Sequence, residues 1–129
     1  MTNESGEALA RHVLEVLAGR GESLATAESL TGGLLSATLT DVPGASRSFA
    51  GAIVSYATRI KESLLGVPVE VVAGHGVVSG ECAQAMALGA RARLRTTSAR
   101  PSPVGIRSRS STSPPAVVKV VSSMAVPST

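Results

Sequence analysis

The sequence predicts a single α/β domain, and three observations support that prediction. Segments with helical and strand-like patterns alternate up to about residue 94. The chain has 129 residues, which is enough for one buried core and too few for two ordinary domains. Apolar residues make up 43% of it but aromatic residues only 2%, so the core must be built from Ala, Val and Leu.

The first segment with a helical pattern covers residues 9–17. Its apolar side chains recur at the spacing of one helix face and are Leu9, Val13, Val16 and Leu17. Glycines at positions 19 and 21 supply the left-handed conformation at which helices commonly stop. We therefore expect a helix that ends at this pair of glycines.

The next segments predict a strand, a tight turn and a second helix. Residues 23–27 are small and flanked by turn signals, which favours a short buried strand. Residues 32–40 place leucines at positions 34, 35 and 39, which suits one face of a helix. The residues that follow, DVPG at 41–44, are a turn signature.

A second strand and two more helices are expected downstream. Residues 49–57, FAGAIVSYA, are β-rich and apolar on both faces, which predicts an interior strand. Thr58 could cap a helix that runs to residue 65, and Ser79 could cap a helix over residues 80–93. The inner side of that last helix would carry Ala83, Met86, Ala87 and Ala90. Cys82 is expected to be a small buried hydrophobe on the same helix.

Composition changes abruptly near residue 95. Residues 1–90 carry 5 basic and 9 acidic side chains, whereas residues 91–129 carry 7 basic and no acidic ones. From residue 96 onward, 18 of 34 residues are Ser, Thr or Pro, a composition that cannot bury a core. We therefore predict a partial α/β domain over residues 1–95 and a low-complexity, disordered tail over residues 96–129. The remaining strands of the sheet are missing from this pattern.

Several classes of function are excluded by what the sequence lacks. A single cysteine, Cys82, allows no internal disulfide and no zinc cluster, so we expect neither a metal nor another cofactor. No apolar run approaches the roughly 20 residues of a membrane helix, and the N-terminus lacks a signal-peptide layout. A cytoplasmic protein without a membrane partner is the expectation. The arginines at 91–100 attract nucleic acid only weakly without aromatic residues to stack bases, so nucleic acid is not an expected partner.

The most informative string is TAESLTGG at residues 26–33. A strand that ends in a turn with paired glycines and enters a helix directs backbone N–H groups and the positive end of a helix dipole at one point. A hydroxyl there, such as that of Ser29, would lie beside a ready oxyanion site, as an acyl-transfer nucleophile requires. The alternative interpretation is that Ser29 merely caps the helix and that the glycines allow close packing.

A serine nucleophile needs a base, and neither histidine is well placed to supply one. His12 belongs to the first helix and His75 to a Gly-His-Gly turn. Lys61, in contrast, follows the strand that carries Tyr56, so both residues would lie at the same edge of the sheet as Ser29. That edge is where open α/β sheets bind ligands.

Lys61 could serve as a base only if its pKa were lowered towards neutrality. Burial would do this, and Arg59 or the helix N-terminus could help. The alternative is a solvated lysine paired with Glu62 or Glu28. For Tyr56, plain packing in the core is the corresponding alternative.

Together, five motifs closely resemble the CinA C-terminal domain family, the nicotinamide-nucleotide amidases, whose members are also described as competence/damage-inducible proteins. The motifs are TAESLTGG at 26–33, LTDVPGAS at 39–46, IVSYATRIK at 53–61, LLGVP at 64–68 and GHGVVS at 74–79. They stand in the family's order and spacing, and the resemblance covers residues from about 7 to 94.

The resemblance implies a three-layer α/β/α fold, incomplete at its C-terminal end, and a cytoplasmic enzyme. That enzyme would hydrolyse the carboxamide of nicotinamide mononucleotide to nicotinate mononucleotide and ammonia, without a metal or cofactor. The family's proposed nucleophile falls on Ser29, its lysine base on Lys61, and its strand tyrosine, which would relay or orient the proton, on Tyr56. Residues expected to bind the substrate or the oxyanion are Thr31, Gly32, Gly33 and Arg59. Leu30 stands where many members carry Cys.

The resemblance ends at Leu94. Family members continue with a strand and a Thr-Gly-Ile-Ala-Gly-Pro loop that helps to close the site, and nothing here from Arg95 matches them. A reading-frame shift near this point would explain the change. The rival hypothesis is a non-catalytic nucleotide-binding or interaction protein whose basic tail engages an anionic partner. Self-association into a homo-oligomer is left open by the sequence.

Overall fold

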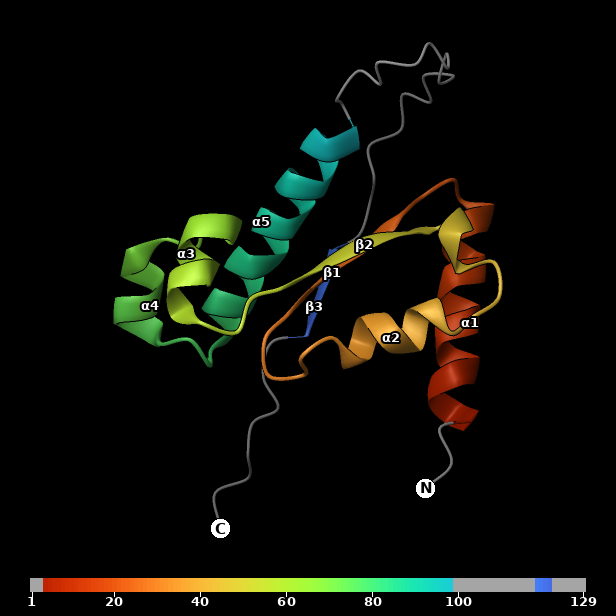
Figure 1. The fold of residues 1–129 in the computed structure, drawn as a ribbon, viewed down its shortest axis with the longest axis horizontal. Helices are drawn as coiled ribbons and strands as arrows, with labels where there is room; N and C mark the ends of the chain where they lie inside the picture. The colour runs from red at the N-terminus through yellow and green to blue at the C-terminus, as the bar shows by residue number, and fades with distance from the viewer. Residues whose placement is uncertain (1–3, 99–117, 122–129) are drawn as a thin grey trace.

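The computed structural model describes residues 4–98 and 118–121 (Figure 1). In chain order the elements are α1 (Glu4–Gly19), β1 (Leu24–Glu28), α2 (Leu34–Thr40), the short 3-10 helix η1 (Ala45–Arg47), β2 (Phe49–Val54), α3 (Thr58–Leu65), α4 (Val69–His75), α5 (Gly80–Ser98) and β3 (Val118–Val121). Helices and strands alternate as the sequence predicts, so the α/β class is confirmed.

The described strands form one parallel sheet with β1 at its centre, in the order β2-β1-β3. Ala27 in β1 lies opposite Ile53 on one side and Val120 on the other. Because the strands are parallel, their carboxyl ends meet at one edge of the sheet. The segments that follow β1 and β2 therefore begin side by side.

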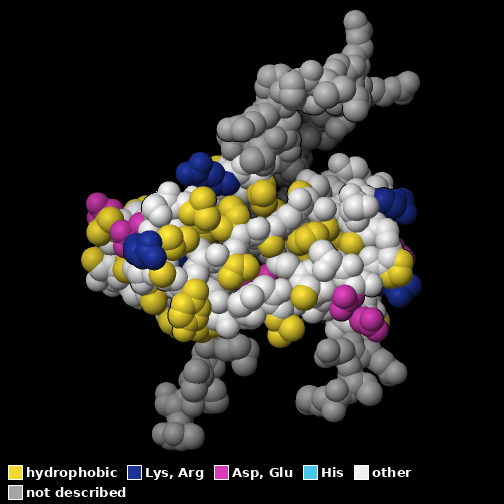
Figure 2. All heavy atoms as spheres, viewed as in Figure 1, with side chains coloured by type: hydrophobic (Ala, Val, Ile, Leu, Met, Phe, Trp, Pro, Cys, Tyr) yellow, Lys and Arg dark blue, Asp and Glu magenta, His cyan; other side chains and the backbone are white. Residues whose placement is uncertain are grey.

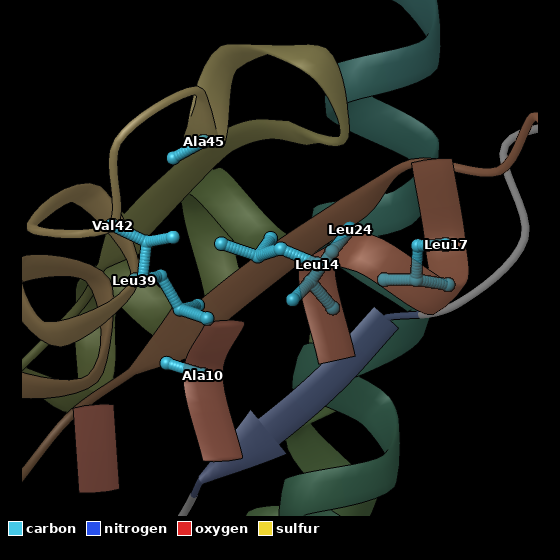
Figure 3. Packing of buried hydrophobic residues seen from close by; sticks show 7 residues of the cluster. All are labelled: Ala10, Leu14, Leu17, Leu24, Leu39, Val42 and Ala45. Atoms are coloured by element: carbon cyan, nitrogen blue, oxygen red, sulfur yellow. The ribbon is translucent and has the colours of Figure 1, made fainter. Parts of the chain in front are cut away.

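Two apolar clusters, one on each face of the sheet, make three layers (Figure 1). The cluster formed by α1, α2, η1 and the start of β1 is shown in Figure 3 and comprises Ala10, Leu14, Leu17, Leu24, Leu39, Val42 and Ala45. The cluster beneath α3 and α5 comprises Ala27, Leu65, Val67, Cys82, Met86 and Ala90, with Ile53 packed against it. This is the expected α/β/α arrangement.

Side chains of β1 alternate between these two layers, as strand geometry requires. Leu24 belongs to the α1–α2 cluster and Ala27 to the α3–α5 cluster. By the same alternation, Glu28 faces α2 and Ser29, directly after the strand, faces the α3–α5 side. Adjacent residues of one motif thus enter opposite layers.

The inner face of α1 agrees with the expected one at Leu17 and Val13, which pack in the core, and differs from it elsewhere. Leu9 and Val16 are 64% and 42% exposed, whereas Ala10 and Leu14 are buried together with Leu17. The 3.6-residue period fits both sets, and only the packing of α1 against α2 and η1 selects the second. The end of the helix at Gly19, with Gly21 at φ 66°, agrees with the expected stop.

The prediction of an interior strand at 49–57 is wrong. β2 ends at Val54, lies at the edge of the described sheet, and alternates half-buried and exposed residues. Small apolar residues suit a strand that is covered on both faces. Whether a second layer actually covers the other face depends on the tertiary structure, which the local sequence does not specify.

The helix caps follow the sequence in part. Ser79 caps α5 as expected, because its Oγ accepts a hydrogen bond from the N–H of Cys82 at 3.1 Å. Thr58 is not a cap; Ala57 holds that position for α3 without a side-chain bond. His75 is the last residue of helix α4, which the sequence did not predict because the Gly-His-Gly pattern indicated a turn.

Two elements of the structure extend into the predicted tail. Helix α5 runs to Ser98, beyond the expected end at Arg93, and Val118–Val121 forms β3 against β1. These four residues include three valines, and β1 offers an edge of free backbone groups to pair with. The other residues of the predicted tail lie outside the described ones.

Hydrophobic side chains reach the surface at many points on the face seen in Figure 2. The exposed large ones include Leu30, Leu34, Val54 and Tyr56, from segments that follow β1 or belong to the end of β2. No helix within residues 4–98 is long and apolar enough to cross a membrane.

Close packing of α5 on α3 yields the first prediction. A Cβ added at Gly89 would overlap the carbonyl group of Leu65, so Gly89→Ala must push the two helices apart. We expect it to lower the free energy of unfolding by about 3 kcal/mol, measured by urea denaturation. The control is Gly74→Ala in α4, where a Cβ meets no atom within 4 Å and should be neutral or stabilising. Equal stability of the two variants would contradict this packing.

Candidate active site

The candidate site lies where β1 and β2 end. Ser29 follows β1 directly, and Lys61 lies in the first turn of α3, a few residues after β2. The N–H of Ser55 donates to the carbonyl of Glu28 at 2.8 Å, which continues the pairing of the two chains beyond the strands. This backbone bond holds the two segments together at the edge of the sheet.

The structure brings Ser29 and Lys61 into direct contact. Lys61 Nζ donates to Ser29 Oγ at 2.8 Å, and also to the carbonyl oxygens of Ser55 at 2.8 Å and Tyr56 at 2.7 Å. Lys61 is 2% exposed and Ser29 is 7% exposed. The alternative of a solvated lysine is therefore wrong: the aliphatic stem is buried and the amine reaches the end of β1.

Lys61 is buried without a carboxylate partner. Its hydrogen-bond partners are three uncharged oxygens, and no ion pair among residues 4–98 includes it. Burial lowers the pKa of Lys61 below its usual value, although a charge interaction with the nearby Cys82 opposes this. The expected help from Arg59 is absent, because Arg59 is exposed to solvent and is not among the causes. Burial alone weakens the charged form.

The three oxygens around Nζ suit both protonation states of Lys61. An ammonium has three N–H groups and can donate one to each oxygen. A neutral amine has two N–H groups for the carbonyls of Ser55 and Tyr56, which leaves its lone pair directed at the hydroxyl of Ser29. The same positions therefore allow the amine to receive a proton from the hydroxyl without moving.

On the opposite face, Glu28 is a fully buried carboxylate that organises the start of α2. Its Oε1 accepts from Thr31 Oγ1 at 2.9 Å and from the N–H of Leu35 at 2.8 Å. Its Oε2 accepts from the N–H of Ser36 at 3.1 Å and from the Ser36 hydroxyl. Burial acts to raise the pKa of Glu28, but these hydrogen bonds outweigh it and hold the pKa below its usual value.

The turn between Ser29 and α2 differs from the anion site that the sequence suggested. Glu28 already occupies the N–H groups of Leu35 and Ser36 in the first turn of α2. Gly32 donates its N–H to the carbonyl of Ser29 at 3.0 Å. Among the described residues, the N–H groups of Thr31 and Gly33 make no hydrogen bond, and Gly33 adopts φ 108°. The first turn of α2 is therefore occupied by Glu28 rather than open to an anion.

Tyr56 is placed differently from the expected proton relay. Its phenol is 72% exposed and makes no hydrogen bond in the described structure, whereas its backbone carbonyl binds Lys61. The alternative of core packing for Tyr56 is excluded by the same exposure. Its role, and those of Arg59 and the turn residues in binding a substrate, stay predictions.

Sequence reasoning missed two residues of the site. The sequence suggested Glu28 only as a partner of Lys61. An acidic residue at the end of a run of small buried residues, just before a Gly-Gly turn, could have indicated a carboxylate that accepts hydrogen bonds from the following helix. Ser55 continues the inward positions of β2 after Ile53, so alternation could have placed it in the core. Among the described residues, no group of three or more His, Cys, Asp or Glu side chains could hold a metal ion.

Comparison with known proteins agrees with this fold. The sequence pattern of the CinA C-terminal domain family matches residues 6–101. The chain belongs to this family. A CinA-like protein of Frankia casuarinae is 56% identical over 85 residues, which cover 66% of this chain and 20% of that protein. A relative from Mycoplasma pneumoniae, the MG115 homolog, is 51% identical over 85 residues, 66% of this chain and 54% of its own length.

A solved structure shares the fold of this CinA-type chain. The competence/damage-inducible protein CihA of Agrobacterium tumefaciens matches with a TM-score of 0.66 and 38% identity, over 68% of this chain and 53% of that one. The chain thus spans about a fifth to a half of the length of these relatives. Ser29, Lys61 and the turn between β1 and α2 all lie inside the matched region.

Glu28 yields the second prediction. Glu28→Gln replaces one accepting oxygen by an NH₂ group that faces donors, and should lower the free energy of unfolding by about 2–3 kcal/mol in urea titrations at neutral pH. The matched control is Glu15→Gln, at an exposed position of α1, which should have little effect.

The same clamp should be sensitive to acid. Because the pKa of Glu28 is lower in the folded chain than the usual 4.5, its stabilisation is complete above about that pH. It is lost as the pH falls through the folded-state pKa. The urea midpoint should therefore fall more steeply in acid for the unmodified chain than for Glu28→Gln, and parallel curves would contradict the assignment.

Proposed function

We propose that this CinA-type chain hydrolyses a carboxamide with Ser29 as nucleophile and Lys61 as base. The observation that carries the proposal is the buried 2.8 Å hydrogen bond between Lys61 Nζ and Ser29 Oγ, with no carboxylate among the described residues paired with Lys61. A lysine in this environment exists as an amine more readily than one in water, and only the amine can accept a proton from the hydroxyl. A structural salt bridge would have supplied the missing carboxylate.

In the first half of the reaction, Lys61 takes the proton of Ser29 while Oγ bonds to the carboxamide carbon. The carbonyl oxygen becomes an oxyanion, for which the N–H groups of Thr31 and Gly33 are the available donors. The C–N bond then breaks, Lys61 returns its proton to the departing nitrogen, and ammonia leaves. Ser29 is left as an ester of the substrate acid, and Lys61 is again an amine.

The second half repeats these steps with water. Lys61 takes a proton from the water molecule as its oxygen bonds to the ester carbon. The bond to Ser29 Oγ breaks, the serine recovers the proton from Lys61, and the carboxylic acid leaves and ionises. The balance is one amide and one water converted to one carboxylate and one ammonium ion.

Nicotinamide mononucleotide is the substrate that we propose, because the family resemblance implies it. It carries a carboxamide on an aromatic ring and a phosphate. The exposed side chains of Leu30 and Tyr56 stand beside the site and can offer apolar contact to the ring, and the exposed guanidinium of Arg59 on α3 can meet the phosphate. The product would be nicotinate mononucleotide.

The third prediction tests the Ser29–Lys61 pair directly. Incubation of the purified 129-residue chain with nicotinamide mononucleotide should release ammonia. Ser29→Ala should abolish the release, and Lys61→Met, which keeps an apolar stem of similar length, should lower it about 10²–10⁴-fold. The matched control is Ser63→Ala, an exposed serine on α3, which should retain full activity. Ammonia release that survives in Ser29→Ala would overturn the assignment.

The fourth prediction concerns pH. The base form of Lys61 grows as the pH rises through its pKa, which burial holds below the usual 10.5. The rate kcat/KM should therefore rise with pH and level off below pH 10.5. The chain has two lysines, Lys61 and Lys119, so NMR titration of ¹⁵N,¹³C-lysine gives a direct comparison. A rate that does not follow the titration of Lys61 would exclude it as the base.

The binding hypothesis has its own signature in the same experiments. Calorimetric binding of nicotinamide mononucleotide that persists in Ser29→Ala, with no ammonia from the unmodified chain, would support a nucleotide-binding protein instead. The basic tail invoked by that hypothesis lies largely outside the described residues.

A further inference from the structure

The hydroxyl of Ser55 is buried and unpartnered beside the candidate active site. Ser55 is 0% exposed, and within the described structure its Oγ has no hydrogen-bond partner. Both backbone groups of the residue are engaged, the N–H with the carbonyl of Glu28 and the carbonyl with Lys61 Nζ. A buried polar group without a partner costs folding free energy, so this hydroxyl requires an explanation.

Ser55 faces the same layer as the Ser29–Lys61 pair. Ile53, two residues earlier, packs against the α3–α5 cluster, and strand alternation points Ser55 to the same side. Its own carbonyl lies 2.8 Å from Lys61 Nζ. The hydroxyl belongs to a residue that already contacts the amine through its backbone, and rotation about the Cα–Cβ bond alone changes its distance from Nζ.

The proposed reaction creates a need for another acceptor near Lys61. In the resting site, an ammonium at Lys61 donates to Ser29 Oγ and to the carbonyls of Ser55 and Tyr56. Once Ser29 Oγ has bonded to the substrate carbon, it is a weaker and displaced acceptor, at the moment when Lys61 carries the proton. A nearly fully buried ammonium that loses one of three partners is destabilised, because little solvent is available to replace that partner.

We propose that Ser55 is a positioning residue whose hydroxyl rotates to accept a hydrogen bond from the protonated Lys61 when Ser29 is engaged with the substrate. The Ser55 hydroxyl, which has no partner among the described residues in the resting site, would then replace the Ser29 hydroxyl as the acceptor for Lys61. Ser55 acts through Lys61 and does not contact the substrate. Its benefit to catalysis rests on the proposed amide hydrolysis, whereas the exchange of acceptors does not.

The exchange can be measured without any substrate. Ser29→Ala removes one acceptor permanently and should recruit Ser55 Oγ to Lys61. In that background, adding Ser55→Ala should lower the pKa of Lys61 clearly further, whereas Ser55→Ala alone should change it little. The readout is the NMR titration of labelled lysine, with Lys119 as internal reference. Equal effects of Ser55→Ala in the two backgrounds, or none in either, would overturn the proposal.

A second buried serine provides the matched control. Ser48 is 2% exposed, and its Oγ donates to the carbonyl of Leu14 at 2.9 Å in the other layer. Ser48→Ala should lower the thermal midpoint and leave the titration of Lys61 unchanged. Ser55→Ala should not lower the midpoint, because it removes an unpartnered hydroxyl. A drop equal to that of Ser48→Ala would show an ordinary structural hydroxyl and contradict the exchange.

The kinetic consequence separates this inference from the proposed function. Ser55→Ala should lower kcat about tenfold or more and leave KM unchanged, because one hydrogen bond to a charged intermediate is lost. If the unmodified chain releases no ammonia, the amidase proposal fails, and the titration still decides whether Ser55 exchanges with Ser29. If the chain is active and Ser55→Ala has full kcat, the positioning role is wrong.

Discussion

The amine of Lys61 is held in the interior by three uncharged oxygens, and the geometry of the site follows from that arrangement. The carbonyls of Ser55 and Tyr56 come from the segment after β2, and Ser29 Oγ comes from the segment after β1. Only parallel neighbouring strands place those two segments together. Helix α5 packs beside α3 and contributes the fully buried Cys82, which lies near enough to interact with the charge of Lys61.

A buried acid and a buried base coexist in the site because the sheet separates them. Glu28 and Ser29 are consecutive, yet they enter opposite layers. Four hydrogen bonds from Thr31, Leu35 and Ser36 satisfy the carboxylate of Glu28, so it has no need of a cation. Lys61 thereby has no counterion in the part of the chain that the structure describes, and its burial lowers its pKa because no salt bridge offsets it there.

All residues proposed to act in chemistry belong to the region shared with CinA-type relatives. That region contains both strand ends, the Gly-Gly turn and the lysine helix, and it accounts for about half of the solved CihA chain. The surface beside the site bears exposed Leu30, Val54 and Tyr56, from the segments that follow β1 and end β2. Exposed apolar side chains thus adjoin in sequence the buried polar groups of Ser29 and Lys61.

The sequence by itself determined the α/β class, the cap at Ser79 and the convergence of Ser29 with Lys61, because these depend on local patterns and on the parallel alternation of strand and helix. It could not choose between the two apolar stripes of α1 or identify β2 as an edge strand. Those features depend on which neighbour covers each face, and a local pattern contains no information about neighbours. The clamp at Glu28 and the unpartnered hydroxyl of Ser55 were decided only by the tertiary structure, since hydrogen-bond partners are set by packing in three dimensions.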